Sequence, residues 1–257
     1  MRLVALALVA CCVLRAAPPV PTTFPTGHMR VDGNTIRDAR NRPILLYGAN
    51  AETLFLNTTA GEAQSVFFTM RSWNMNAARV FSSITDLQKD PDRHLAQLAR
   101  LAEMASTQQI VLIIALVSEP TTRHKLPTAA ALAHWKSVAT QLKDAPGVIF
   151  DLFDDPSFGD GVGEPSGAAW KIWREGGIVD GEQYIGMQAL AGVIRAAGAT
   201  QLIIAEGLGG VFSNIGDNLL SDSSVIYAAR ESLAESGRAA GEWGRSFGFL
   251  AGRVPSR

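Results

Sequence analysis

Two adjacent carboxylates follow a buried strand in the middle of the chain. Residues 150–156 read FDLFDDP, so Asp154 and Asp155 come after an apolar segment and stand before Pro156. In enzymes built from parallel βα units, catalytic groups lie at the carboxyl ends of the strands, where carboxylates serve as acids, bases or nucleophiles. Asp154 and Asp155 are therefore candidate catalytic residues. An ordinary acidic turn between a strand and a helix would give the same pattern.

Apolar segments at regular intervals predict the elements that position these carboxylates. We expect short buried strands at residues 44–48, 77–81, 110–116, 147–153, 201–205 and 224–228, after a hairpin at 29–37, and helices at 92–106, 128–142 and 183–197. Strands that alternate with helices predict right-handed βαβ units. A doubly wound open sheet has the same local pattern, but no glycine-rich phosphate loop follows the first strand. We predict an α/β fold of the (β/α)8 TIM-barrel type with about six βα units present.

The composition narrows the class of protein. The chain has 257 residues, 47% of them hydrophobic, and a net charge of −1. This is enough apolar material for one large core, and the near-neutral charge argues against a nucleic-acid binder.

The N-terminus predicts export. Arg2 precedes an apolar run at residues 3–14, and Ala16 and Ala17 offer a cleavage site. We therefore expect a signal peptide at 1–17, a linker at 18–26 and one domain at 27–257, in a secreted protein without a stable membrane span, because the run is too short to span a bilayer. Processing as a lipoprotein at Cys11 is an alternative. Both cysteines lie in this segment, so the domain carries no thiol chemistry.

Several segments, in order, resemble glycoside hydrolase family 5, the cellulase-like retaining glycosidases. The resemblance runs from about residue 29 to 253, and the segments that carry it are 31–50 (VDGNTIRDARNRPILLYGAN), 70–81 (MRSWNMNAARVF), 134–156 (HWKSVATQLKDAPGVIFDLFDDP), 170–177 (WKIWREGG) and 184–208. It implies a (β/α)8 barrel that hydrolyses β-linked oligo- or polysaccharides with two carboxylates about 5–5.5 Å apart. It implies no metal and no cofactor, and it makes Arg79 an active-site arginine.

The chain departs from the family pattern at the acid. Asp154 and Asp155 stand where the family has Asn-Glu, which makes Asp155 the acid/base residue and Asp154 a substrate-binding residue. Aspartate is one methylene shorter than glutamate, and a misplacement of about 1 Å costs about a hundredfold in rate. An ionised Asp154 only accepts hydrogen bonds, whereas an amide also donates them. We therefore expect impaired activity.

Other family positions are also altered. No histidine aligns at the end of the third strand; His124 follows in the next loop, where it either reaches the cleft or is solvated. By register, Arg230 and Ser232 replace the histidine and the aromatic ring of the sixth strand. Arg230 is either a ligand for a sugar hydroxyl or a surface arginine.

Four tryptophans are assigned from their local patterns. Trp170 and Trp173 either offer flat faces to a sugar or pack the end of the barrel. Trp73 and Trp135 fall in helical patterns, and we expect both in the core.

The nucleophile is the weakest part of the resemblance. Glu242, in the sequence GEWG, is the candidate, but no apolar strand precedes it, and an exposed helical glutamate is the alternative. After Ala228 only 29 residues remain, fewer than two βα units need, so we expect truncation before strand seven. The alternatives to an impaired hydrolase are a non-catalytic carbohydrate-binding relic and an unstable fragment with exposed strand edges.

Overall fold

The computed structural model describes residues 24–52, 54, 59–117, 122–159 and 165–230. The expected signal peptide, Cys11 and Glu242 therefore lie outside the described residues, as does most of the expected linker.

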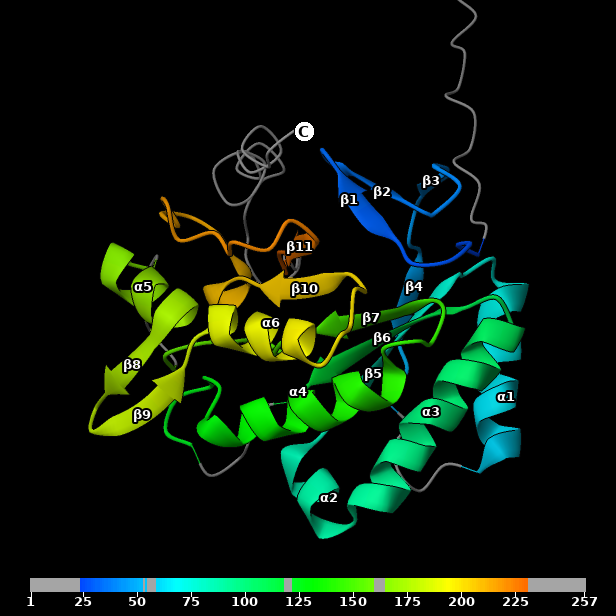
Figure 1. Ribbon diagram of the computed structural model, residues 1–257, viewed down its shortest axis with the longest axis horizontal. Helices are drawn as coiled ribbons and strands as arrows, with labels where there is room; N and C mark the ends of the chain where they lie inside the picture. The colour runs from blue at the N-terminus through cyan, green and yellow to red at the C-terminus, as the bar shows by residue number, and fades with distance from the viewer. Residues whose placement is uncertain (1–23, 53, 55–58, 118–121, 160–164, 231–257) are drawn as a thin grey trace, which may run out of the picture.

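A six-stranded parallel sheet forms the centre of the described structure (Figure 1). Its order is β11-β10-β7-β6-β5-β4, and the strands are β4 (Gly48–Asn50), β5 (Ala77–Ser82), β6 (Val111–Leu116), β7 (Val148–Asp151), β10 (Ile203–Glu206) and β11 (Val225–Ala228). Each neighbouring pair is parallel. This curled arrangement matches part of a (β/α)8 barrel and confirms the predicted fold class.

The two sides of the sheet carry different cores because successive side chains of a strand point to opposite faces. One side packs against the helices α1 (Ala60–Ser72), α2 (Ile84–Lys89), α3 (Pro91–Thr107), α4 (Ala129–Leu142) and α6 (Met187–Ala196). The other side, which we call the inner face, carries a second cluster of Met29, Ile44, Ala77, Val111, Ile149, Leu202 and Ile204. In Figure 1, α3, α4 and α6 lie along one side of the sheet and the small sheet β1–β3 stands on the other.

The small sheet covers the amino end of the inner face. Its strands are β1 (Arg30–Asp32), β2 (Thr35–Arg37) and β3 (Pro43–Ile44), and all pairs are antiparallel. Met29 and Ile44 pack on the first residues of the central strands. The hairpin predicted at 29–37 is thus present, with one further strand.

The strand predicted at 44–48 is wrong in its extent. Ile44 belongs to β3, and the barrel strand β4 begins only at Gly48. The buried side chain of Asn76 explains the division: its Nδ2 donates to the Leu45 carbonyl (2.7 Å), and its Oδ1 accepts from the Tyr47 N–H (2.8 Å). These bonds occupy the backbone groups that would otherwise extend a strand.

The helix predicted at 183–197 begins later than expected. Residues 182–185 form β9 (Glu182–Ile185), which pairs with β8 (Gly176–Val179) in a hairpin after α5 (Gly167–Glu175). A Cβ atom at Gly186 would lie 2.2 Å from the Arg174 carbonyl oxygen, so this contact requires glycine between hairpin and helix. The helical spacing of apolar side chains is present from Met187 onward, but Tyr184 belongs to the strand.

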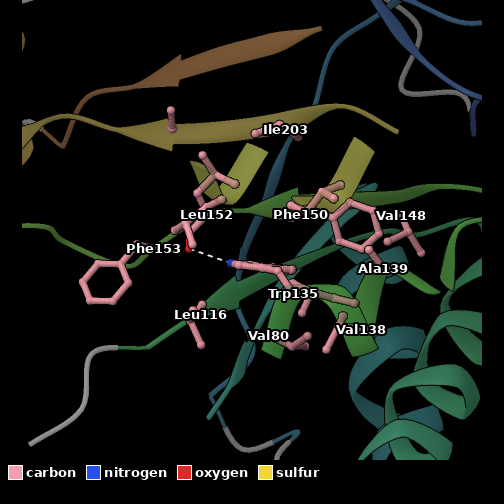
Figure 2. Close-up of a cluster of buried hydrophobic side chains, with 14 of the residues drawn as sticks. Val80, Leu116, Trp135, Val138, Ala139, Val148, Phe150, Leu152, Phe153 and Ile203 are labelled. Carbon is pink, nitrogen blue, oxygen red and sulfur yellow. Dashed lines mark hydrogen bonds between the residues drawn. The ribbon is translucent and has the colours of Figure 1, made fainter. Parts of the chain in front are cut away.

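Trp135 is a core residue, as predicted. Its side chain is fully buried, and its Nε1 donates to the Leu152 carbonyl at 3.0 Å, which links α4 to the end of β7 (Figure 2). The same prediction for Trp73 is wrong: 65% of this residue is exposed. Trp73 is the C-cap of α1, so it leaves the helical face that its sequence pattern indicated.

Asp38 stabilises the turn between β2 and β3, and its replacement tests that role. Its buried carboxylate accepts from the N–H groups of Thr26, Arg40 and Arg42 and from the Arg42 guanidinium. Burial opposes ionisation, but these donors together hold the pKa of Asp38 well below its usual range. We expect Asp38→Ala to lower the free energy of unfolding by about 3 kcal/mol at pH 7, because it removes a buried carboxylate and the charge-assisted hydrogen bonds that it accepts.

The pH dependence of this effect has a defined sign. A carboxylate with a depressed pKa in the folded state stabilises above its unfolded pKa, near 4, and this contribution is lost as the pH falls below that value. Urea unfolding at pH 7 and pH 3 should therefore show a smaller difference between wild type and Asp38→Ala at pH 3. Asp32→Ala, which removes an exposed ion pair with Arg37, is the control and should change stability by less than about 1 kcal/mol. An equal deficit at both pH values would contradict the assignment.

Candidate active site

The carboxyl end of the inner face is charged, whereas the rest of that face is apolar. Alternation along the strands places Arg79 two residues after Ala77, Asp151 two after Ile149, and Glu206 two after Ile204. Arg230 follows β11 in the same alternation. Four of the six strands, β5, β7, β10 and β11, therefore deliver ionisable groups to one edge of the sheet.

Arg79 is the centre of this cluster. Its Nε donates to Asp151 Oδ2 (2.8 Å), and its Nη2 donates to Asp154 Oδ1 (2.9 Å) and Glu206 Oε1 (2.6 Å). Its guanidinium also lies 4.8 Å from the centre of the Phe81 ring. Burial alone would lower the pKa of Arg79, but the charges of Asp151 and Glu206 outweigh burial and raise it. Arg79 is thus a permanently charged residue that holds three carboxylates together.

Arg230 holds two of the same carboxylates from the other side. Its Nη2 donates to Asp154 Oδ1 and, at 3.0 Å, to Glu206 Oε1, and its Nε lies 2.9 Å from Glu206 Oε2. Glu206 and Asp154 raise the pKa of Arg230 against the effect of burial. Arg230 is therefore not a plain surface arginine. The other predicted alternative, contact with a sugar hydroxyl, stays a prediction; 41% of the Arg230 side chain is exposed and could be reached by a sugar.

Asp151 is the most deeply buried carboxylate of the cluster. Only 1% of it is exposed, and its Oδ1 has no hydrogen-bond partner among the described residues. Burial raises the pKa of Asp151, the charges of Glu206 and Asp154 raise it further, and Arg79 opposes them. The sequence analysis did not single out Asp151, because it reads as an interior position of an apolar strand.

Glu206 is the main site residue that the sequence analysis missed. It ends β10, is 3% exposed, and contacts Arg79, Arg230 and the N–H of Asp155. The signal was available: residues 201–206 read QLIIAE, an apolar strand that ends in an acid, as the Asp154 segment does.

Asp155, the predicted acid/base residue, lies beside the cluster and faces outward. Its backbone has a φ of 51°, in the left-handed region, and its N–H donates to Glu206 Oε2 at 2.9 Å. One third of its side chain is exposed, and Lys125 Nζ donates to its Oδ2 at 3.1 Å. The structure thus brings Asp154 and Asp155 together with Arg79 and Arg230. In this arrangement Asp155 accepts a hydrogen bond, whereas a general acid must donate a proton.

His124 is neither in the cluster nor solvated. It is 9% exposed; its Nδ1 lies 2.8 Å from the Phe158 carbonyl oxygen and its Nε2 lies 2.9 Å from Asp180 Oδ2. The expectation of a solvated loop histidine is therefore wrong. His124 connects the loop after Asp155 to the turn of the β8–β9 hairpin, which lies beyond the carboxyl ends of β7 and β10 in Figure 1.

Trp170 and Trp173 are buried and do not line the surface of the site. Their exposed fractions are 0% and 1%, and the rings meet edge to face at 5.4 Å. Trp170 Nε1 donates to the Ser213 carbonyl (2.8 Å), and Trp173 Nε1 donates to the Glu206 carbonyl (2.9 Å). The alternative in which they bind substrate with flat exposed faces is wrong for rings buried to this degree; the packing alternative agrees with the structure.

Two kinds of site are not found in the described part of the chain. There, no group of three or more histidine, cysteine, aspartate or glutamate side chains is arranged to hold a metal ion. No helix within the same residues is long and apolar enough to cross a membrane.

Comparisons with known proteins agree with the fold. The family model of cellulase, glycosyl hydrolase family 5, matches residues 37–235. A beta-glucanase from Saccharophagus degradans in complex with cellotetraose superposes with a TM-score of 0.68 at 18% identity, over 94% of this chain and 76% of that one. An endocellulase from Pyrococcus horikoshii in complex with cellotetraose gives 0.63 at 16% identity, over 89% and 78%.

A more distant solved structure extends the comparison. The catalytic domain of an endoglucanase from Thermobifida fusca gives a TM-score of 0.57 at 16% identity, over 78% of this chain and 63% of that one. No curated protein sequence matches the chain. The structural similarities, all at low identity, establish a shared fold, and the family model covers most of the sequence. This protein belongs to the cellulase family, glycosyl hydrolase family 5.

Proposed function

We propose that this protein binds β-linked glucans at the carboxyl end of the inner face and hydrolyses their O-glycosidic bonds slowly, with Asp155 as acid/base. The observation that carries the proposal is the cluster of carboxylates and arginines supplied by β5, β7, β10 and the end of β11 at that edge. Two relatives of the same fold were solved with cellotetraose, which supports a β-glucan as the substrate class.

The contacts of Asp155 support slow turnover. It carries one methylene fewer than glutamate, and it is paired with Lys125, which must release the carboxylate before a leaving oxygen can be protonated. The partner carboxylate of a retaining reaction must stand about 5–5.5 Å away and be free to attack. Glu242, outside the described residues, remains our proposed nucleophile.

A non-hydrolytic carbohydrate-binding protein is the second candidate. It is favoured by one specific observation: Asp154, Asp155 and Glu206 each form an ion pair with an arginine or a lysine. Carboxylates held in this way can still accept hydrogen bonds from sugar hydroxyls, but they are poorly placed to attack carbon or to donate a proton.

Hydrolysis of an aryl β-cellobioside by the full chain separates the two candidates. We expect slow turnover in the wild type and a loss of about a hundredfold in Asp155→Ala, the usual contribution of a positioned acid. Asp32→Ala, in the hairpin at the amino end, is the control and should retain wild-type turnover.

Each other outcome has a defined meaning. Equal rates in wild type and Asp155→Ala would remove Asp155 from the reaction. Cellotetraose binding in calorimetry with no turnover would favour the binding protein. Neither binding nor turnover would reject both candidates.

We further propose that the protein is secreted after removal of residues 1–17. The support is the sequence of the N-terminus, with its apolar run and its small residues at 16 and 17. N-terminal sequencing of protein from the culture medium should begin near Pro18, whereas a lipid-modified product beginning at Cys11 would support the lipoprotein alternative.

A further inference from the structure

We propose that Glu206 is a positioning residue for Asp155, which it holds through the Asp155 backbone and not through its side chain. The inference rests on the proposed function, because it assigns Glu206 a part in a reaction that Asp155 carries out.

The contact lies at a point where the chain needs support. Asp155 has a φ of 51°, in the left-handed region that few residues other than glycine, asparagine and aspartate adopt. The N–H of that residue donates to Glu206 Oε2 at 2.9 Å. Glu206 therefore accepts from the backbone group whose direction fixes where the Asp155 carboxylate points.

Both the carboxylate and the main-chain carbonyl of Glu206 are held by hydrogen bonds or ion pairs. Arg79 and Arg230 contact its Oε1 at 2.6 and 3.0 Å, and Arg230 Nε lies 2.9 Å from its Oε2. Its main-chain carbonyl accepts from Trp173 Nε1 at 2.9 Å. A carboxylate fixed by two arginines, on a residue whose main chain is held by a buried tryptophan, has a defined position, as a positioning residue must.

The same contacts argue against a direct chemical role. The Glu206 side chain is 4% exposed, and both oxygens are occupied by charged donors. A nucleophile must present a free oxygen to the anomeric carbon, and a general acid must carry a proton. Glu206 therefore acts through Asp155.

Two conservative variants separate positioning from charge neutralisation. Glu206→Asp keeps the charge beside Arg79 and Arg230 but draws the carboxylate back by one methylene, out of reach of the Asp155 N–H. Glu206→Gln keeps the length and an oxygen acceptor but loses the charge. A residue that only neutralises the arginines should tolerate Glu206→Asp better; a residue that positions Asp155 should tolerate Glu206→Gln better.

The measurements are hydrogen exchange at the Asp155 amide by NMR and the kinetics of aryl β-cellobioside hydrolysis. In Glu206→Asp we expect exchange to accelerate about tenfold from the loss of one hydrogen bond, and kcat to fall about a hundredfold from the displaced carboxylate. KM should change little, because the substrate contacts remain. In Glu206→Gln both quantities should change less than in Glu206→Asp, because the amide oxygen can still accept from the Asp155 N–H.

The reverse order of the two variants, in exchange or in kcat, would overturn the inference. If the wild type shows no turnover, the proposed hydrolysis fails, and the exchange measurement still decides by itself whether Glu206 holds the Asp155 backbone. Thermal unfolding of both variants checks that each is folded when it is measured.

Discussion

Replacement of Arg79 by methionine is expected to lower the free energy of unfolding by about 3–5 kcal/mol, the cost of removing one partner from a buried ion pair. The side chain is 13% exposed and holds Asp151, Asp154 and Glu206 within 2.9 Å. Without it, three carboxylates remain close together with Arg230 as their nearest counter-charge. Urea unfolding at pH 7 measures the loss.

The pH dependence and a control distinguish this effect from a general loss of packing. The folded pKa of Asp151 is already raised by burial and by its acidic neighbours, so the folded state takes up protons more readily than the unfolded chain. The contribution of Asp151 to stability therefore decreases as the pH rises above about 4, and this decrease should be larger in Arg79→Met.

Arg37→Met removes an exposed ion pair with Asp32 and should change stability by less than about 1 kcal/mol. If Arg79→Met and Arg37→Met had the same effect, Arg79 would not be the centre of a buried cluster.

Replacement of Trp173 by alanine is expected to cost about 3–5 kcal/mol, which is typical of a fully buried aromatic residue. The ring is 1% exposed, packs against Trp170, and donates to the carbonyl of Glu206. The substitution leaves a cavity and an unpaired carbonyl at the end of β10. Thermal and urea unfolding measure the loss, and Trp173→Phe should show a smaller one, because it keeps most of the ring volume.

Trp73→Ala is the matched control for this prediction. The sequence pattern favours a core position for Trp73, but the structure exposes 65% of it. We expect its removal to change stability by less than about 0.5 kcal/mol, as for most surface substitutions. A loss comparable to that of Trp173→Ala would mean that a further part of the protein covers Trp73.

The order and type of the central strands could be predicted from the sequence. Residues 77–81, 110–116 and 147–153 read as buried strands, and the structure places β5, β6 and β7 there. Short, nearly continuous apolar runs indicate these strands, because a strand covered on both faces is apolar at almost every position. For the same reason Asp154 and Asp155 could be assigned to the end of a strand without a structure.

The residues whose surroundings the sequence left open or predicted wrongly depend on contacts between distant segments. Trp173 had two alternatives, and it is buried because its ring meets Trp170 and its Nε1 donates to the Glu206 carbonyl, 33 residues away. His124 becomes buried because Asp180 and the Phe158 carbonyl, 56 and 34 residues away, meet it. A pattern of neighbouring residues cannot reveal contacts between residues that lie so far apart in the sequence.

The sequence by itself determined the family, the parallel βα order and the position of the acid pair, because each depends on residue type and short-range spacing. Only the tertiary structure decided what the acids contact. Glu206 and Arg79 are 127 residues apart in the chain and 2.6 Å apart in space, since the alternation of side chains along β10 and β5 directs both onto the inner face. The ion cluster around Arg79 is a product of that register.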